Sequence, residues 1–112
     1  MKEFVFLYRT DFKNMPKHSP EEMQATTKKW MDWMSGIAEQ NKLADRGKRL
    51  TGEGRVLKAH NVVSDGPYTE LKESLGGFSI VKVDSYAEAL ELAKGCPIFT
   101  FGGNVEIREV SL

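Results

Sequence analysis

The chain has 112 residues, with sixteen basic and sixteen acidic side chains. This length suits one domain spanning residues 1–112. The balanced charge gives no net field to attract nucleic acid, so nucleic acid is not an expected partner. The apolar runs are far shorter than the ~20 residues of a membrane-spanning helix, and the N-terminus does not read as a signal peptide. We therefore expect a soluble cytoplasmic protein without a membrane partner.

Residues 2–10 are predicted to form a strand with two apolar faces. Three aromatic residues from Phe4 to Tyr8 alternate with Val5 and Leu7. In a small antiparallel sheet, helices normally cover one face and the other is left to water. A strand that is apolar on both faces needs a cover on the second face as well. We expect a second copy of the chain to provide that cover.

The segment "SPEE" predicts the start of a helix that runs to about Asn41. Ser19 suits the N-cap, Pro20 the first helical position, and Glu22 can complete a capping box. An apolar stripe follows at the spacing of a buried helix face, formed by Met23, Thr27, Trp30, Met34 and Ile37. Trp33 falls off this stripe.

Further elements follow from turn signals and periodicity. We expect a loop at 42–54, two short strands around a turn in 55–63, a strand at 77–83, a helix at 85–94, a loop at 97–103 and a strand at 104–110. This order predicts an α+β fold, a ferredoxin-like βαββαβ sandwich with two helices on one face of an antiparallel sheet. Pairing of the bare sheet faces would make a homodimer.

The single cysteine, Cys96, excludes an internal disulfide and a thiolate metal cluster. It lies where a helix ends, without the positive helix terminus that lowers a thiol pKa, so a structural role is expected. The sequence contains no GxGxxG, Walker or HExxH motif. Neither a cofactor nor a metal is predicted.

The stretch "SDGPYTELKESLGG" carries two turn signals within a dozen residues. Pro67 fixes its own backbone angle, Gly66 reaches angles closed to other residues, and Asp65 can cap the turn. Gly76 and Gly77 allow a close approach to the backbone or a bulge before the strand. This pattern indicates a shaped loop that borders a pocket.

Several segments resemble the DGPF-domain branch of the YCII-related family: "DGPYTELKESLGGFSIVKVDSYAEALELAKGCP", "GGNVEIREV", "SPEEMQ" and "KWMDWM". Tyr68 stands where the family usually has phenylalanine. The resemblance implies a ferredoxin-like fold that assembles as a dimeric α/β barrel. It also implies enzymatic activity through a histidine and aspartate pair in the wider family, and an association of the DGPF branch with extracytoplasmic-function sigma factors.

By that resemblance the aspartate of the pair falls on Asp65. The histidine does not carry over, because related sequences place it on the first helix where this chain has Thr26. Threonine does not titrate near neutral pH and cannot replace it in proton transfer. His60, five residues before Asp65, is the candidate substitute, although turn capping by Asp65 and a solvated His60 are the favoured roles. His18 is expected on the surface.

The predicted cleft is bounded by residues 65–77, the first helix and the loop at 42–55. Its candidate ligand-binding residues are Trp30, Trp33, Gly66, Pro67, Tyr68, Gly76 and Gly77, with Asp65 and His60 as candidate catalytic groups. A core role is favoured for Trp30, and Trp33 can line a cleft or fill a subunit contact. The basic residues Arg46, Lys48, Arg49 and Arg55 either clamp an anion or form a solvated loop; interleaved acidic residues favour the solvated loop.

Two functions remain open at this stage. One is a small-molecule site with possible enzymatic activity near the DGPY loop. The other is a non-catalytic regulatory or protein-interaction module with an unknown protein partner, which the missing helix histidine favours. The fold alone cannot select a chemistry.

Overall fold

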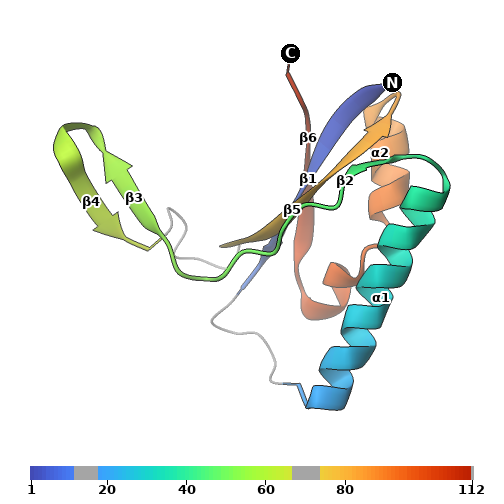
Figure 1. The fold of residues 1–112 in the computed structure, drawn as a ribbon, viewed down its shortest axis with the longest axis horizontal. Helices are drawn as coiled ribbons and strands as arrows, with labels where there is room; N and C mark the ends of the chain where they lie inside the picture. The colour runs from blue at the N-terminus through green and yellow to red at the C-terminus, as the bar shows by residue number, and fades with distance from the viewer. Residues whose placement is uncertain (12–17, 67–73, 112) are drawn as a thin grey trace.

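The computed structural model describes residues 1–11, 18–66 and 74–111 (Figure 1). Its strands are β1 (Lys2–Thr10), β2 (Leu43–Asp45), β3 (Arg55–Lys58), β4 (Val62–Asp65), β5 (Ser74–Val83) and β6 (Asn104–Glu109). Its α-helices are α1 (Pro20–Glu39) and α2 (Tyr86–Ala93), and two 3₁₀ helices are η1 (Ala59–Asn61) and η2 (Pro97–Phe101).

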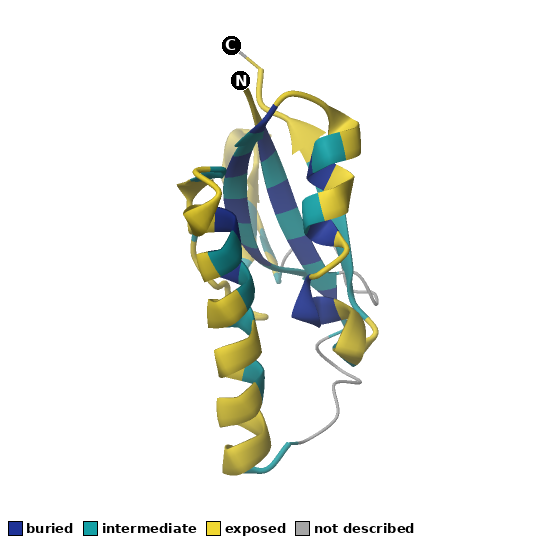
Figure 2. Ribbon diagram, turned by 90° about the vertical axis from the view of Figure 1, so that its right-hand side faces the viewer, coloured by how far each residue is buried: buried dark blue, intermediate teal, exposed yellow. Residues whose placement is uncertain are grey.

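The main sheet has the antiparallel order β2-β5-β1-β6. Both α-helices cover the same face of this sheet (Figure 2). Taken with α1 and α2, this strand order is that of a ferredoxin-like βαββαβ sandwich, into which the β3–β4 hairpin is inserted. The predicted fold class is therefore confirmed.

The second strand of the sandwich lies elsewhere than predicted. It is β2, inside the segment expected to be a loop, whereas the hairpin expected at 55–63 forms a separate two-stranded sheet. The Lys82 amide donates to the Lys42 carbonyl at 2.7 Å, and Leu43 packs against the core. A strand of three residues is too short to show an alternating pattern, so only its pairing with β5 reveals it.

We call β3, η1 and β4 the arm. The arm projects away from the main sheet (Figure 1), and three of its apolar side chains, Leu57, Val62 and Val63, are more than half exposed. A lone two-stranded hairpin is marginally stable in water.

The two faces of β1 differ in cover. Phe4, Phe6 and Tyr8 face the helices and are buried, as are Val81 and Val83 of β5. On the opposite face, the half-buried apolar side chains are Val5, Leu7, Phe78 and Ile80. Among the described elements, no helix covers this second face.

The helices are set by their caps and held by the core. Ser19 and Glu22 form the predicted capping box, and the Ser85 hydroxyl accepts the Glu88 amide at the start of α2. Met34 and Ile37 of α1 are buried against the sheet, as predicted from the stripe. Met23 and Thr27, in the half of α1 that extends past the sheet, are exposed, so the prediction of a buried stripe is wrong there. No helix in the described part of the chain combines the length and apolar content that a bilayer crossing needs.

The segment expected to be a loop at 97–103 contains η2. Pro97 fixes the backbone angle of its first residue, and Gly102, at a φ of 74°, ends it in the left-handed conformation. Ile98 is buried by this turn. The turn also brings Phe101 toward the start of α1, where its ring meets that of His18.

Candidate functional site

A cavity of about 460 Å³ lies between the first half of α1, the end of β1, the start of β5, η2 and the segment 46–49. The first half of α1 extends past the sheet and is exposed over most of its surface (Figure 2). This half of α1 therefore forms a wall of the cavity and does not cover the core. The volume is within the range of small-molecule sites, about 300–1,000 Å³.

The apolar wall is supplied by large side chains from three elements. Trp30 lies edge-to-face against Tyr8, with ring centroids 5.0 Å apart. Met34, Ile98 and Phe101 add to this wall. Flat aromatic and sulfur-containing surfaces of this kind contact the face of a ring or another apolar body.

Three polar atoms around the cavity lack a hydrogen-bond partner among the described residues: the Tyr8 hydroxyl, Thr10 Oγ1 and His18 Nε2. Tyr8 and Thr10 are only 7% and 8% exposed. A buried polar group without a partner costs about 1–3 kcal/mol. All three atoms belong to residues that line the same cavity.

Burial raises the pKa of Tyr8. The Ser79 hydroxyl itself donates to the Arg46 carbonyl at 2.7 Å, so its hydrogen is directed away from Tyr8. Tyr8 thus remains a neutral hydroxyl at physiological pH, able to donate a hydrogen bond into the cavity.

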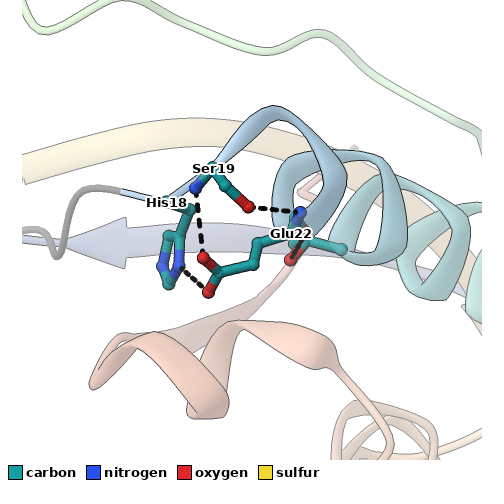
Figure 3. A network of polar contacts seen from close by, with 4 residues as sticks. His18, Ser19 and Glu22 are labelled. Atoms are coloured by element: carbon teal, nitrogen blue, oxygen red, sulfur yellow. Dashed lines mark hydrogen bonds and ion pairs between the residues drawn. The ribbon is translucent and has the colours of Figure 1, made fainter.

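His18 is held by contacts on two sides. Its Nδ1 lies 3.2 Å from Glu22 Oε2, and its ring meets Phe101 edge-to-face at 5.3 Å (Figure 3). The other carboxylate oxygen of Glu22 accepts the Ser19 amide at 3.1 Å. This backbone hydrogen bond, with a smaller contribution from His18, lowers the pKa of Glu22 and keeps the carboxylate ionised.

The segment 46–49 closes one side of the cavity because two glycines let it approach β5. A Cβ on Gly77 would lie 2.8 Å from the Lys48 carbonyl oxygen, and a Cβ on Gly47 would overlap the Phe78 carbonyl. The close approach predicted for Gly77 is therefore present. It brings Arg46, Lys48 and Arg49 to the cavity, although their side chains are exposed.

The candidate catalytic pair from the sequence lies on the arm, not at this cavity. His60 occupies the turn of the arm with a φ of 65° and is exposed. The Asp65 side chain is 95% exposed, and its Oδ1 lies 3.4 Å from Arg55 Nε. The structure therefore does not bring Asp65 together with the tryptophans.

The candidate ligand-binding residues divide into three groups. Trp30, Gly76 and Gly77 line the cavity. Gly66 follows β4 at the end of the arm and does not line the cavity. Pro67 and Tyr68 lie outside the described residues.

Trp33 occupies a place that the sequence did not predict. Its Nε1 donates to the Leu92 carbonyl at 3.0 Å, and its ring lies so near Gly95 that an added Cβ would be 3.2 Å away. Trp33 therefore packs α1 against α2 and is not among the described residues that line the cavity.

Tyr8, Thr10 and His18 were missed as site residues by the sequence reasoning. Tyr8 and Thr10 continue the buried face of β1, where the alternating pattern predicts core residues only. His18 precedes the N-cap and has an acidic residue four positions later, a spacing that allows the contact with Glu22. No signal in the sequence predicts that η2 lies next to His18.

Cys96 is buried, and burial raises its pKa to about 12, so the group is an un-ionised thiol. This agrees with the structural role expected from the sequence. Within the described residues, no three histidine, cysteine or acidic side chains gather as metal ligands.

The model of the YCII-related domain family matches residues 4–112 of this chain. A similar solved structure is the 5-chloro-2-hydroxyhydroquinone dehydrochlorinase (TftG) from Burkholderia phenoliruptrix AC1100, in complex with 2,5-dihydroxybenzoquinone. It is 17% identical, covers 96% of this chain and 93% of its own, and has a TM-score of 0.45, too low to bear on the site. No curated protein matches the sequence.

Proposed function

The chain belongs to the YCII-related family, and within that family we propose that it binds an anionic small molecule with a flat apolar body in the cavity beside Tyr8. The observation that carries the proposal is the group of three unpartnered polar atoms on Tyr8, Thr10 and His18. A protein retains such atoms against their energetic cost when a ligand satisfies them. The "DGPY" motif favours the DGPF branch.

The chemistry of the lining supports this ligand class. The cations Arg46, Lys48 and Arg49 border the cavity, and no acidic side chain is among its described lining residues. A carboxylate would therefore meet favourable charge at this side. The aromatic rings of Trp30 and Phe101 suit an unsaturated ring, and the hydroxyls of Tyr8 and Thr10 suit an oxygen acceptor.

Phenylpyruvate is a suitable probe because it joins an aromatic ring, a carbonyl and a carboxylate. Binding should quench tryptophan fluorescence through Trp30 and raise the unfolding midpoint as the probe concentration rises. Two controls each lack one part: pyruvate has no ring, and 1-phenyl-2-butanone has an ethyl group in place of the carboxylate. Each should bind at least about tenfold more weakly, a difference of about 1.4 kcal/mol.

Removal of single hydroxyls tests the site itself. Tyr8→Phe and Thr10→Val should each weaken phenylpyruvate binding by about fivefold or more, as expected for loss of one hydrogen bond. Asp65→Asn, on the arm, is the matched control and should bind normally. Saturable binding that is equally strong in all three variants, or no binding by the wild type, contradicts the proposed site.

We also propose that two chains form a homodimer through the helix-free face of the sheet. The half-buried side chains of Val5, Leu7, Phe78 and Ile80 support this, because an apolar face without a cover is unfavourable in water. Leu7→Lys should convert dimers to monomers in light scattering at micromolar concentration. Met31→Lys, on the 58% exposed outer side of α1, is the control and should remain dimeric. A monomeric wild type would contradict this assembly.

A second function is favoured by one observation, the exposed apolar side chains Leu57, Val62 and Val63 on the arm. Such side chains suit a protein partner, in keeping with a regulatory module of a sigma-factor system. Two results together would favour this function over the ligand site: phenylpyruvate does not bind, and a protein partner that the wild type captures is not captured by Leu57→Asp.

A further inference from the structure

His18 and Glu22 form a pair whose geometry exceeds the needs of a helix cap. The cap explains why Glu22 accepts the Ser19 amide at 3.1 Å and why the Ser19 hydroxyl accepts the Glu22 amide at 3.2 Å. It does not explain the second carboxylate oxygen, which lies 3.2 Å from His18 Nδ1 (Figure 3). Nor does it explain the opposite ring nitrogen, Nε2, which is buried without a partner among the described residues.

The contact with Glu22 selects the tautomer of the His18 ring. An ionised carboxylate accepts a hydrogen bond, so the neutral ring holds its proton on Nδ1 and leaves a lone pair on Nε2. Phe101 restrains the ring from a second direction, with the ring centroids 5.3 Å apart. An oriented imidazole with a free lone pair beside a ligand cavity has the arrangement of a general base.

The neighbours of His18 at the cavity are donors. The hydroxyls of Tyr8 and Thr10 are buried and without partners among the described residues, and the cations of segment 46–49 border the same cavity. Hydroxyl and cationic donors can stabilise an oxygen that gains negative charge during a reaction. A base and such donors around one cavity suit removal of a proton from carbon next to a carbonyl.

We propose that His18 Nε2 removes a proton from a carbon next to a carbonyl in the bound ligand, with Glu22 as the positioning residue. The inference rests on the ligand site proposed above and names its substrate class, a ring-bearing 2-oxo acid or a related enolisable carbonyl compound. The C–H bond breaks, its proton forms an N–H bond at Nε2, and its electron pair becomes the C=C bond of an enolate. The carbonyl π pair moves to the oxygen, which Tyr8 and Thr10 bind.

The cycle closes when the imidazolium returns a proton to the enolate oxygen or carbon. No group changes its net oxidation state, so no oxidant or reductant takes part. In D₂O the imidazolium N–H exchanges with solvent before the proton is returned, and the methylene group of phenylpyruvate therefore becomes deuterated. Proton NMR follows this exchange directly, after subtraction of a blank without protein.

The two histidines of the chain provide a matched comparison. His18→Gln should slow the catalysed exchange at least about 100-fold, the lower range for loss of a general base. His60→Gln makes the same chemical change on the exposed arm and should exchange at the wild-type rate. Exchange is compared at saturating phenylpyruvate, so that a change of affinity in His18→Gln does not enter the measured rate.

Glu22→Gln tests the positioning role. The amide oxygen of glutamine can still accept the Ser19 amide, but the charge that fixes the His18 tautomer is absent. Exchange should slow about tenfold, because a carboxylate that is 62% exposed is partly screened by water. Nitrogen NMR of the ring should show a proton fixed on Nδ1 in the wild type and a mixture of tautomers in Glu22→Gln. A cap alone predicts no change at the ring nitrogens.

The possible outcomes separate the two proposals. If phenylpyruvate binds but the wild type does not exceed the blank, or His18→Gln matches the wild type, the base assignment is overturned and the ligand site stands. If phenylpyruvate does not bind, both proposals fall. Should His18→Gln misfold, His18→Ala with added imidazole replaces it, and restored exchange supports the assignment while unrestored exchange in a folded variant contradicts it.

Discussion

The cavity and the arm each contain a histidine and other polar groups, but these groups differ in how far they are buried. His18 meets Glu22 and Phe101 and has a buried ring nitrogen, whereas His60 stands exposed in the turn of the arm. The arm gathers its polar residues from neighbours in sequence. The cavity gathers Tyr8, His18 and Ser79 from distant segments. The two regions therefore differ in burial as well as in how far apart in sequence their polar residues lie.

The largest expected difference between the two regions is in stability. Phe6→Ala empties a fully buried position next to Trp33 and should lower the free energy of unfolding by about 3–5 kcal/mol. Leu57→Ala, at a 68% exposed position on the arm, should change it by less than about 0.5 kcal/mol. Urea unfolding at low protein concentration measures both. Similar losses would mean that the arm is part of the core.

A smaller difference is expected for two glycines. Gly77→Ala places a methyl group 2.8 Å from the Lys48 carbonyl, so the segment 46–49 must shift, at about 1–3 kcal/mol. Gly66→Ala has open space but a φ of 81°, which strains alanine by about 1–2 kcal/mol.

Both glycine variants should thus be less stable, while only Gly77→Ala should lose phenylpyruvate affinity. Unfolding curves and fluorescence titrations on the same samples separate the two effects. Equal affinity in both variants would show that the close approach at Gly77 does not shape the cavity.

Low pH should lower the stability of the N-terminal end of α1, where Ser19 and Glu22 form the cap. The pKa of Glu22 is lower in the folded chain than its ordinary value of 4.5, so its contribution to stability is complete above 4.5. The contribution disappears as the pH falls through the lower folded value. The stability difference between wild type and Glu22→Gln should therefore shrink over this range in acid-dependent urea unfolding. If the difference in free energy of unfolding stays constant as the pH falls, the ionised Glu22 carboxylate does not stabilise the start of α1.

The smallest effect is expected at Asp65. Its side chain and that of Arg55 are 95% and 62% exposed, and exposed ion pairs contribute only about 0–1 kcal/mol. Asp65→Asn should leave both stability and phenylpyruvate affinity near the wild-type values. A large loss of affinity with normal stability would move the site from the cavity to the DGPY loop.

Much of the fold could be predicted from the sequence because local signals agree with one another. Ser19 and Glu22 marked the start of α1, and the alternation of β1 identified both of its faces. The strand β2 could not be predicted, because three residues show no period and only the pairing with β5 defines them. The arm was expected as a hairpin, but its separation from the main sheet depends on tertiary pairing.

The site was less predictable than the fold. Trp30, Gly76 and Gly77, selected as ligand-binding candidates, line the cavity, while their role in binding stays a prediction. Tyr8 could not be distinguished from a core residue, because alternation indicates which face a side chain takes and not whether its hydroxyl finds a partner. That distinction requires three-dimensional neighbours.

The most direct test of the site is the stability of Tyr8→Phe without ligand. If the Tyr8 hydroxyl is buried without a partner, its removal relieves an unsatisfied polar group and should raise the free energy of unfolding by about 1 kcal/mol. Urea unfolding of the two proteins under identical conditions gives this difference. A decrease would mean that the hydroxyl already has a structural partner in the folded chain, and would contradict a cavity held ready for a ligand.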